Sequence, residues 1–301
     1  MNAIFFTQSQ ALDVFYELYI RLKDRMPFGQ VGFYVANLQW YEIFLELHPD
    51  FESQFPVVKE WEIYEEADGH KPDLERIRRY EVEFGDPTLW GPCVTDRRIY
   101  QGANATFRQD YAPQFSHEEM LAILDVALVK IDALFAEIQP QLVSTIYTAT
   151  FGDVIGHMMA RSRCVRAFDL RLARLKNYVM FSDGIVDPPP HITEHFKRFE
   201  DDIPQNLVNE AEDYLESVIS KNAMYEGVVP AAVGKKQLFT FPKFGTVSKK
   251  VNSGFSLILQ LYKNRKAPYC YDYQNAGTFK PILYRKLLNP LNAIKIKSRL
   301  K

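Results

Sequence analysis

The chain has 301 residues, 47% hydrophobic and 25% charged, with a formal net charge of −2, which is the composition of an ordinary globular protein. It contains no apolar run of about 18 residues, which argues against a membrane-spanning helix, and its apolar start has no basic residues, unlike a signal peptide. Three widely spaced cysteines without a CxxC motif argue against a disulfide framework or a zinc cluster. These features favour a reducing, cytoplasmic location.

The first part of the chain alternates short apolar segments with amphipathic ones. Buried strands are expected at residues 3–7, 31–36 and 56–64. Ser9 can cap a helix that continues to Leu22, and apolar residues at helical spacing predict a second helix over 38–47. A charged helix is expected over 71–84.

The clearest helix begins at Ser116, which forms a capping box with Glu119 and precedes apolar residues at helical spacing as far as Ile138. Pro140 then prevents further helix. Three more strands and one more helix follow. The strands are expected at 141–146, 165–170 and 178–182, and the helix at 151–161.

Strands that alternate with helices predict an α/β fold with a Rossmann-like, mostly parallel sheet flanked by helices. We assign this domain to residues 1–190. Beyond the three prolines at 188–190 the alternation ends, so residues 191–301 are expected to form a helical and irregular extension with an acidic helix at 206–220.

The end of the chain is strongly basic. Residues 243–301 carry 13 Lys and Arg and one acidic residue, Asp272, while the rest of the chain is acidic. This asymmetry suggests an anionic partner, such as a phosphate-bearing ligand, an anionic membrane surface or nucleic acid. Pairing with the acidic body of the same chain is an equally good explanation. Tyrosines lie among these bases, but no nucleic-acid-binding module accompanies them, so nucleic acid is the weakest candidate.

Several common active-site motifs are missing. The chain has no GxxxxGK[ST], GxGxxG, HExxH or GxSxG sequence, which argues against P-loop, dinucleotide, zincin and hydrolase-elbow chemistry. It also has no DxD pair to hold a metal and a nucleotide diphosphate. His191 and His195 have metal-ligand spacing on a helix, but no third ligand lies nearby in the sequence. We therefore expect no cofactor and no metal.

Four segments stand out in the central span: DRRIY at 96–100, EIQPQLV at 137–143, FGD at 151–153 and LARLKNYVMFSD at 172–183. Together they resemble the capsule polysaccharide biosynthesis family of bacterial surface polysaccharide glycosyltransferases. The order of these segments matches the family, although Gln141 stands where the family has an aspartate after the proline. The resemblance covers roughly residues 1–190 in layout and is sharper from residue 90.

The resemblance implies the N-terminal, acceptor-side half of a metal-independent glycosyltransferase of the GT-B type. In the family, a second domain binds the sugar nucleotide and follows a basic helical linker, which residues 280–301 resemble. The expected partners are a sugar nucleotide or a lipid-linked glycan, with an anionic inner-membrane surface or a capsule-assembly protein as a docking partner. The alternative is a non-catalytic glycan-binding or assembly module that docks on the membrane or on a partner.

Ligands of open α/β sheets bind beyond the carboxyl ends of the parallel strands, so we expect the site in the loops that follow the strands. The candidate substrate-binding residues are Gln8, Ser9, Tyr147, Thr148, Thr150, Arg171 and Arg174. The two arginines are suited to a diphosphate or an acidic sugar, although solvated surface arginines would look the same.

Transfer to a hydroxyl needs a carboxylate or histidine that takes the proton. Asp153 is the first candidate for this catalytic base and Asp183 the second. Asp153 can instead complement the dipole of the helix that it opens, and Asp183 can instead form a turn before Gly184. Asp96 and Arg97 are expected to form an ion pair that orders the following loop, with substrate contact as the alternative.

Overall fold

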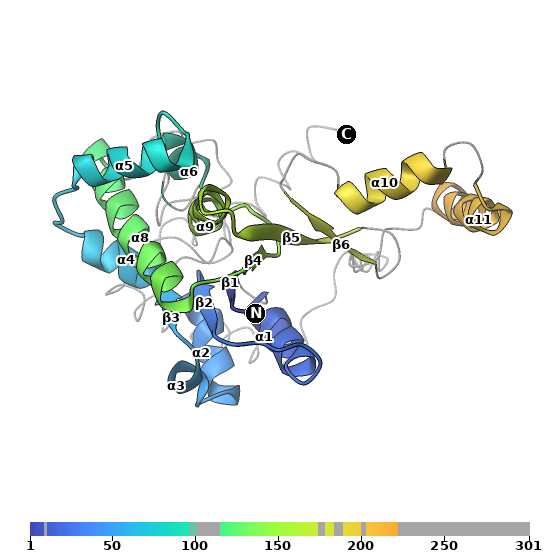
Figure 1. Cartoon of the computed structure of the whole chain (residues 1–301), viewed down its shortest axis with the longest axis horizontal. Helices are drawn as coiled ribbons and strands as arrows, with labels where there is room; N and C mark the ends of the chain where they lie inside the picture. Colours follow the sequence, from blue (N-terminus) through green and yellow to red (C-terminus); the bar gives the residue numbers. More distant parts are fainter. Residues whose placement is uncertain are drawn as a thin grey trace, which may run out of the picture. The chain divides into compact units, whose positions relative to one another are not determined.

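The computed structural model describes residues 1–8, 11–96, 99, 115–173, 178–183, 189–199 and 203–221 (Figure 1). These residues fall into two compact units, with the boundary in the chain between Ala167 and Phe168. The basic segment over residues 243–301 lies outside the described residues. The expected domain boundary near residue 190 stays a prediction.

Six strands form one mixed sheet in the order β3-β2-β1-β4-β5-β6. The strands are β1 (Ala3–Thr7), β2 (Val31–Val35), β3 (Val57–Lys59), β4 (Leu142–Thr145), β5 (Arg166–Leu172) and β6 (Val179–Ser182). β1 pairs in parallel with β2 and β4, and β2 pairs in parallel with β3, whereas β5 and β6 are antiparallel. The predicted α/β class with a mostly parallel sheet is therefore confirmed, and the antiparallel edge strand makes the sheet mixed.

The helices of the first unit include every helix expected between residues 11 and 162. Among the described residues they are α1 (Ala11–Leu22), α2 (Leu38–Leu47), α3 (Phe51–Gln54), α4 (Glu60–Ala67), α5 (Leu74–Phe84), α6 (Trp90–Thr95), α8 (His117–Ile138) and α9 (Phe151–Ser162). The expectation of a strand over 56–64 is wrong beyond Lys59, because helix α4 starts at Glu60. The short helices α3 and α6 were not predicted.

Alternate residues of the central strands pack against different helices. Ile4, Phe6 and Tyr34 belong to the core that α8 and α9 cover. Phe5 stacks on Phe15 of α1 with ring centroids 4.8 Å apart, on the opposite face, where α1, α2 and α3 lie (Figure 1). Because side chains of a strand alternate between faces, two apolar layers enclose β1 and β2.

The long helix α8 begins with the predicted capping box. The Ser116 amide donates to Glu119 Oε2 at 2.6 Å, and the Glu119 amide donates to Ser116 Oγ at 3.2 Å. Twelve residues of the helix are buried, among them the charged Asp125. Nothing in the sequence singles out this aspartate.

Asp125 joins α8 to the start of α5. Its carboxylate accepts hydrogen bonds from His70 Nε2 at 2.9 Å, the Asp73 amide at 2.9 Å, and Arg76 Nε and Nη2 at 2.6 and 3.0 Å. Burial alone would raise the pKa of Asp125, but these donors outweigh it and hold the pKa below its usual value. The charged carboxylate is thus stabilised inside the fold.

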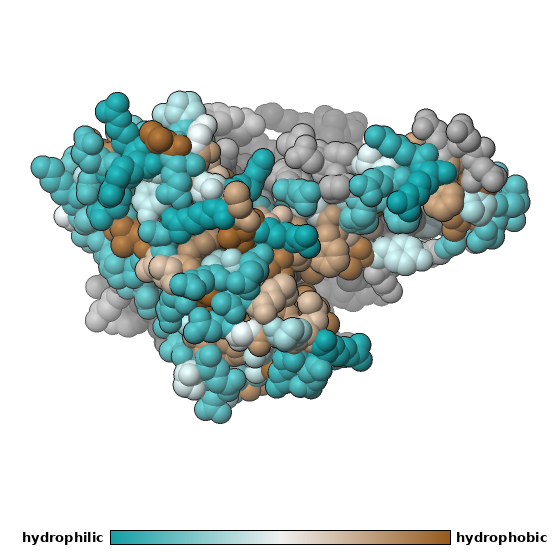
Figure 2. All heavy atoms as spheres, viewed as in Figure 1, coloured by the Kyte–Doolittle hydropathy of each residue, from teal (hydrophilic) through white to brown (hydrophobic). Residues whose placement is uncertain are grey.

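The described residues of the second unit form the rest of β5, β6 and two further helices, α10 (Pro190–Phe199) and α11 (Gln205–Lys221). The acidic helix expected at 206–220 is confirmed as α11. Phe196, Leu215 and Ile219 are exposed on these helices, and Figure 2 shows hydrophobic residues among hydrophilic ones there. Across the described ranges, no helix combines the length and apolar character needed to cross a membrane.

Candidate functional site

The order of the strands reverses between β1 and β4, because β2 and β3 extend the sheet on one side of β1 and β4 lies on the other. The loops that leave the carboxyl ends of two such strands diverge to opposite faces and leave a crevice between them, where α/β proteins bind ligands. Here those loops carry Gln8 after β1, and Tyr147, Thr148 and Thr150 after β4. This edge of the first unit is the candidate site.

Three of the predicted residues are in contact at this edge. Gln8 Nε2 donates to Thr150 Oγ1 at 3.2 Å and also to Asp153 Oδ2. Gln8 is half-buried, whereas Thr150 and Asp153 are buried. The loop after β1 is therefore tied to the start of α9 across the point where the strand order reverses.

The first backbone amides of α9 donate to acidic side chains of the same chain. The Thr150 amide donates to Asp153 Oδ2 at 3.1 Å, and the Phe151 amide donates to Asp96 Oδ2 at 2.9 Å. Both carboxylates are buried, at 0% and 1% exposure. Two acids thus offset the positive end of the helix dipole, which elsewhere attracts phosphate. This end of α9 is poorly suited to a diphosphate.

Asp153 therefore has the helix-capping role that the sequence offered as the alternative to catalysis. Its Oδ2 also lies 3.4 Å from the Ala149 amide, so several donors converge on one oxygen. A base must reach the hydroxyl that it deprotonates, and this carboxylate is fully buried. The catalytic role of Asp153 stays a prediction.

A buried carboxylate that the sequence did not single out lies at the end of the neighbouring strands. Glu60, the first residue of α4, accepts hydrogen bonds from Tyr34 Oη at 2.8 Å and from Tyr64 Oη at 3.2 Å. Tyr34 also lies against Gly152, where a Cβ would be 2.3 Å from its Oη. Because Gly152 has no side chain, the start of α9 can lie directly on the ring of Tyr34. Glu60 was missed because residues 56–64 were expected to be a strand.

The loop after β4 offers both exposed and buried groups. The Tyr147 side chain is 41% exposed, whereas Thr148 is buried with its Oγ1 3.4 Å from Thr145 Oγ1. Tyr147 and the half-buried Gln8 are therefore the predicted residues of this edge that a ligand can reach.

The other predicted residues are in the second unit or outside the described residues. Arg171 lies on β5 and pairs with the buried Asp169 at 2.9 Å, and Asp183 is exposed just after β6. Ser9, Arg97 and Arg174 lie outside the described residues, so the proposed Asp96–Arg97 pair also stays a prediction.

Within the described parts of the chain, no group of three or more His, Cys, Asp or Glu side chains could hold a metal ion. His191 and His195 are exposed on α10. No protein-family model, curated protein or solved structure matches this chain at a significant level. Its fold and its candidate site therefore rest on the sequence and on the geometry given above.

Proposed function

We propose that the first unit binds a glycan acceptor at the edge between β1 and β4, and that the chain acts in bacterial surface polysaccharide biosynthesis. In this proposal it is the acceptor-side, GT-B-like half of a metal-independent glycosyltransferase. The observation that carries the proposal is the contact of Gln8 with Thr150 and Asp153 at the reversal of the strand order.

The groups at this edge suit sugar hydroxyls better than phosphates. Gln8 offers a neutral amide, and Tyr147 offers an exposed ring with a hydroxyl at its tip. Amide and hydroxyl groups hydrogen-bond sugars, and aromatic rings pack on their apolar faces. The carboxylates of Asp96 and Asp153 already occupy amides at the start of α9, so an anionic ligand gains little there.

The resemblance supports the same assignment. Asp96 belongs to its first segment and Phe151 to its third, and the two residues are joined by the hydrogen bond from the Phe151 amide. Segments that are far apart in the sequence thus meet at one edge of the sheet. This arrangement is what a shared functional site would require.

Binding measured by titration calorimetry tests the proposal. Surface-polysaccharide oligosaccharides are expected to bind the full chain, whereas UDP- and CMP-sugars are not expected to bind at this edge. Tyr147→Ala and Gln8→Ala should weaken glycan binding, because each removes a reachable group. Gln54→Ala, at an exposed position of α3, is the matched control. Nucleotide binding that Gln8→Ala abolishes, or glycan binding that neither variant changes, would contradict the proposal.

The complete burial of Asp153 favours the second candidate function, a non-catalytic glycan-binding or assembly module. In that case the edge holds a glycan without a base that can reach it. Incubation of the chain with a bound acceptor, a panel of sugar nucleotides and a separately supplied donor-binding domain of the GT-B type separates the two functions. Transfer that Asp153→Asn removes would favour the enzyme, and binding without transfer would favour the module.

A further inference from the structure

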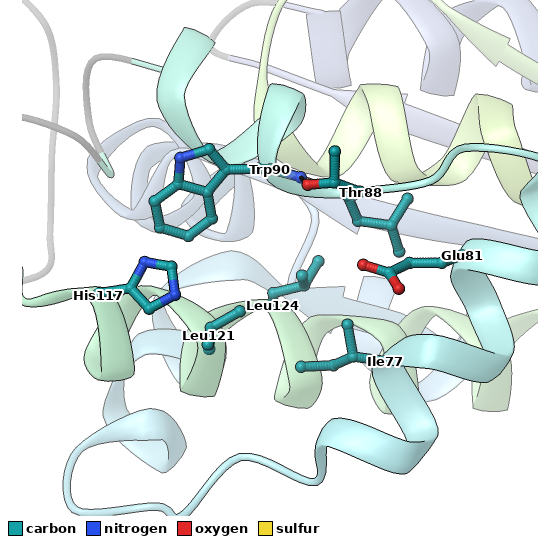
Figure 3. A pocket seen from close by; sticks show the side chains of 8 residues that line it. Ile77, Glu81, Thr88, Trp90, His117, Leu121 and Leu124 are labelled. Atoms are coloured by element: carbon teal, nitrogen blue, oxygen red, sulfur yellow. Dashed lines mark hydrogen bonds between the residues drawn. The ribbon is translucent and has the colours of Figure 1, made fainter.

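A hollow of about 370 Å³ opens between α5, α6 and α8 of the first unit (Figure 3). It shares no residue with the contacts at the edge between β1 and β4. Its volume is within the range of small-molecule sites, which starts at roughly 300 Å³. Aliphatic side chains form its base, among them Ile77, Leu121 and Leu124.

Two rings form one wall of the hollow. The indole of Trp90, the first residue of α6, lies against the imidazole of His117, the first residue of α8, with ring centroids 4.5 Å apart. Figure 3 shows both rings on one side of the hollow and the carboxylate of Glu81 on the other. An aromatic face and a negative charge therefore border the same space.

The carboxylate of Glu81 has no hydrogen-bond or ion-pair partner among the residues that the structure describes. Glu83, two residues later on α5, accepts a hydrogen bond from Arg163 Nε at 3.0 Å, and Arg76 of the same helix is bound to Asp125. Glu81 is half-buried, and a partly desolvated carboxylate gains free energy from a cation that binds beside it.

These groups discriminate between classes of ligand. An anion would be repelled by Glu81, and a sugar would leave hydroxyls against Ile77, Leu121 and Leu124 without hydrogen bonds. An ammonium group gains from Glu81 and from the face of an indole, the aromatic side chain that attracts cations most strongly. An apolar body attached to it would cover the aliphatic base.

We propose that this hollow binds a small organic cation, a protonated amine or quaternary ammonium carried on an apolar body. The cationic group lies between Trp90 and Glu81, and the apolar body lies on Leu121 and Leu124. The site is independent of the glycan site proposed above, and either can exist without the other.

Three probes of similar shape and different charge test this proposal: 2-phenylethylammonium, 2-phenylethanol and 3-phenylpropionate. Each is titrated into the full chain and followed by calorimetry. The ammonium is expected to bind about tenfold more tightly than the alcohol, since one charge-assisted contact contributes about that factor. The carboxylate is expected to bind most weakly. Equal affinity for the ammonium and the alcohol, or no binding of the ammonium at millimolar concentration, would overturn the proposal.

Two variants locate the charge effect. Glu81→Gln should lower the affinity for the ammonium about tenfold and leave the affinity for the alcohol unchanged. Glu75→Gln, an exposed position on the same helix outside the hollow, should change neither. An unchanged ammonium affinity in Glu81→Gln would refute the proposal.

Thermal unfolding of each variant shows whether its fold is intact. If Glu81→Gln does not fold, Trp90→Phe replaces it as the test. This variant keeps an aromatic ring beside His117, but phenylalanine attracts a cation less strongly than tryptophan. That variant is expected to bind the ammonium several-fold more weakly, with the alcohol unaffected. A Trp90→Phe variant that loses affinity for both probes equally would point to packing alone and would also contradict the cation site.

Discussion

Gly156 of α9 lies directly on the ring of Phe6 of β1: a Cβ at position 156 would be 2.2 Å from Phe6 Cζ. Phe6 is buried at 1% exposure and stacks on Tyr34 with ring centroids 5.0 Å apart, so its ring cannot swing into solvent. Together with Gly152 over Tyr34, this contact sets how closely α9 lies on the sheet, and hence where the start of α9 lies relative to Gln8.

Gly156→Ala is expected to destabilise the fold by about 1–3 kcal/mol, because overpacking outweighs the gain of about 1 kcal/mol in helix propensity. Chemical denaturation measures the difference. Gly91→Ala in α6 is the matched control, since nothing lies within 4 Å of its added Cβ. Adding Phe6→Leu to Gly156→Ala should recover part of the loss, and a neutral Gly156→Ala would contradict the close contact.

Asp125→Asn is expected to cost about 2–4 kcal/mol of stability, because the buried site loses a charge that accepts four hydrogen bonds from His70, Asp73 and Arg76. Asp73→Asn is the control. Asparagine is as good a helix cap as aspartate, so the free energy of unfolding of this variant should be close to that of the wild type.

The stability of the wild type and that of Asp125→Asn should depend differently on pH in acid. The folded-state pKa of Asp125 is lowered. The ionised carboxylate therefore makes its full contribution to the free energy of unfolding above the unfolded-state pKa of about 4, and this contribution is lost as the pH falls through the lower folded-state pKa. The stability gap between the wild type and Asp125→Asn should therefore narrow as the pH falls below about 4. Denaturation curves over this range measure the gap, and a gap that widens in acid would show that Asp125 is not held ionised.

Ser116→Ala is expected to destabilise the fold by about 1 kcal/mol, since the Glu119 amide at the start of α8 loses its acceptor. Ser116→Asp should retain most of the stability, because aspartate is an equally good cap. Thermal unfolding compares the three proteins. Equal losses in both variants would indicate that the hydroxyl acts through something other than the cap.

Cys93 and Cys164 are expected to react very differently with alkylating reagents. Burial, with a smaller effect of the Asp96 charge, raises the pKa of the Cys93 thiol to about 12, whereas Cys164 is exposed. At about pH 8, iodoacetamide should alkylate Cys164 in the folded protein and Cys93 only after unfolding, because the thiolate is the nucleophile. Peptide mass spectrometry follows both sites, and fast alkylation of Cys93 would contradict its burial.

The sequence predicted local features best. The capping box at Ser116 and the apolar spacing that follows it predicted α8 in full, because both signals lie within the helix itself. Asp125 within α8 could not be assigned a role, since its partners lie 49 to 55 residues earlier in the chain. Only the packing of α5 against α8 brings them together.

Short apolar segments were harder to interpret. Residues 56–64 combine a short apolar run typical of a strand with the start of a helix. So few residues do not show whether their hydrophobic positions follow the period of a strand or that of a helix. The turn into α4 at Glu60 was therefore missed, and with it the hydrogen bond from Tyr34. Similarly, the spacing of hydrophobic residues in β6 does not distinguish an antiparallel edge strand from a parallel one.

The candidate site was predictable in outline. The rule that ligands bind at the carboxyl ends of parallel strands selected Gln8 and Thr150, which the structure brings into contact. The same rule selected Arg171, which instead pairs with Asp169 on its own strand. Asp169 and Arg171 are two residues apart on one strand, and their pairing depends on the burial of Asp169. The sequence alone did not reveal that burial.

The most direct test of the proposed glycan site is photoaffinity labelling with a surface-polysaccharide oligosaccharide that carries a diazirine. Peptide mapping of the labelled full chain is expected to place the label on the peptides that contain Gln8 and Tyr147, and Tyr147→Ala should reduce it while Gln54→Ala does not. A label confined to other parts of the chain, or one that Tyr147→Ala leaves unchanged, would contradict a glycan site between β1 and β4.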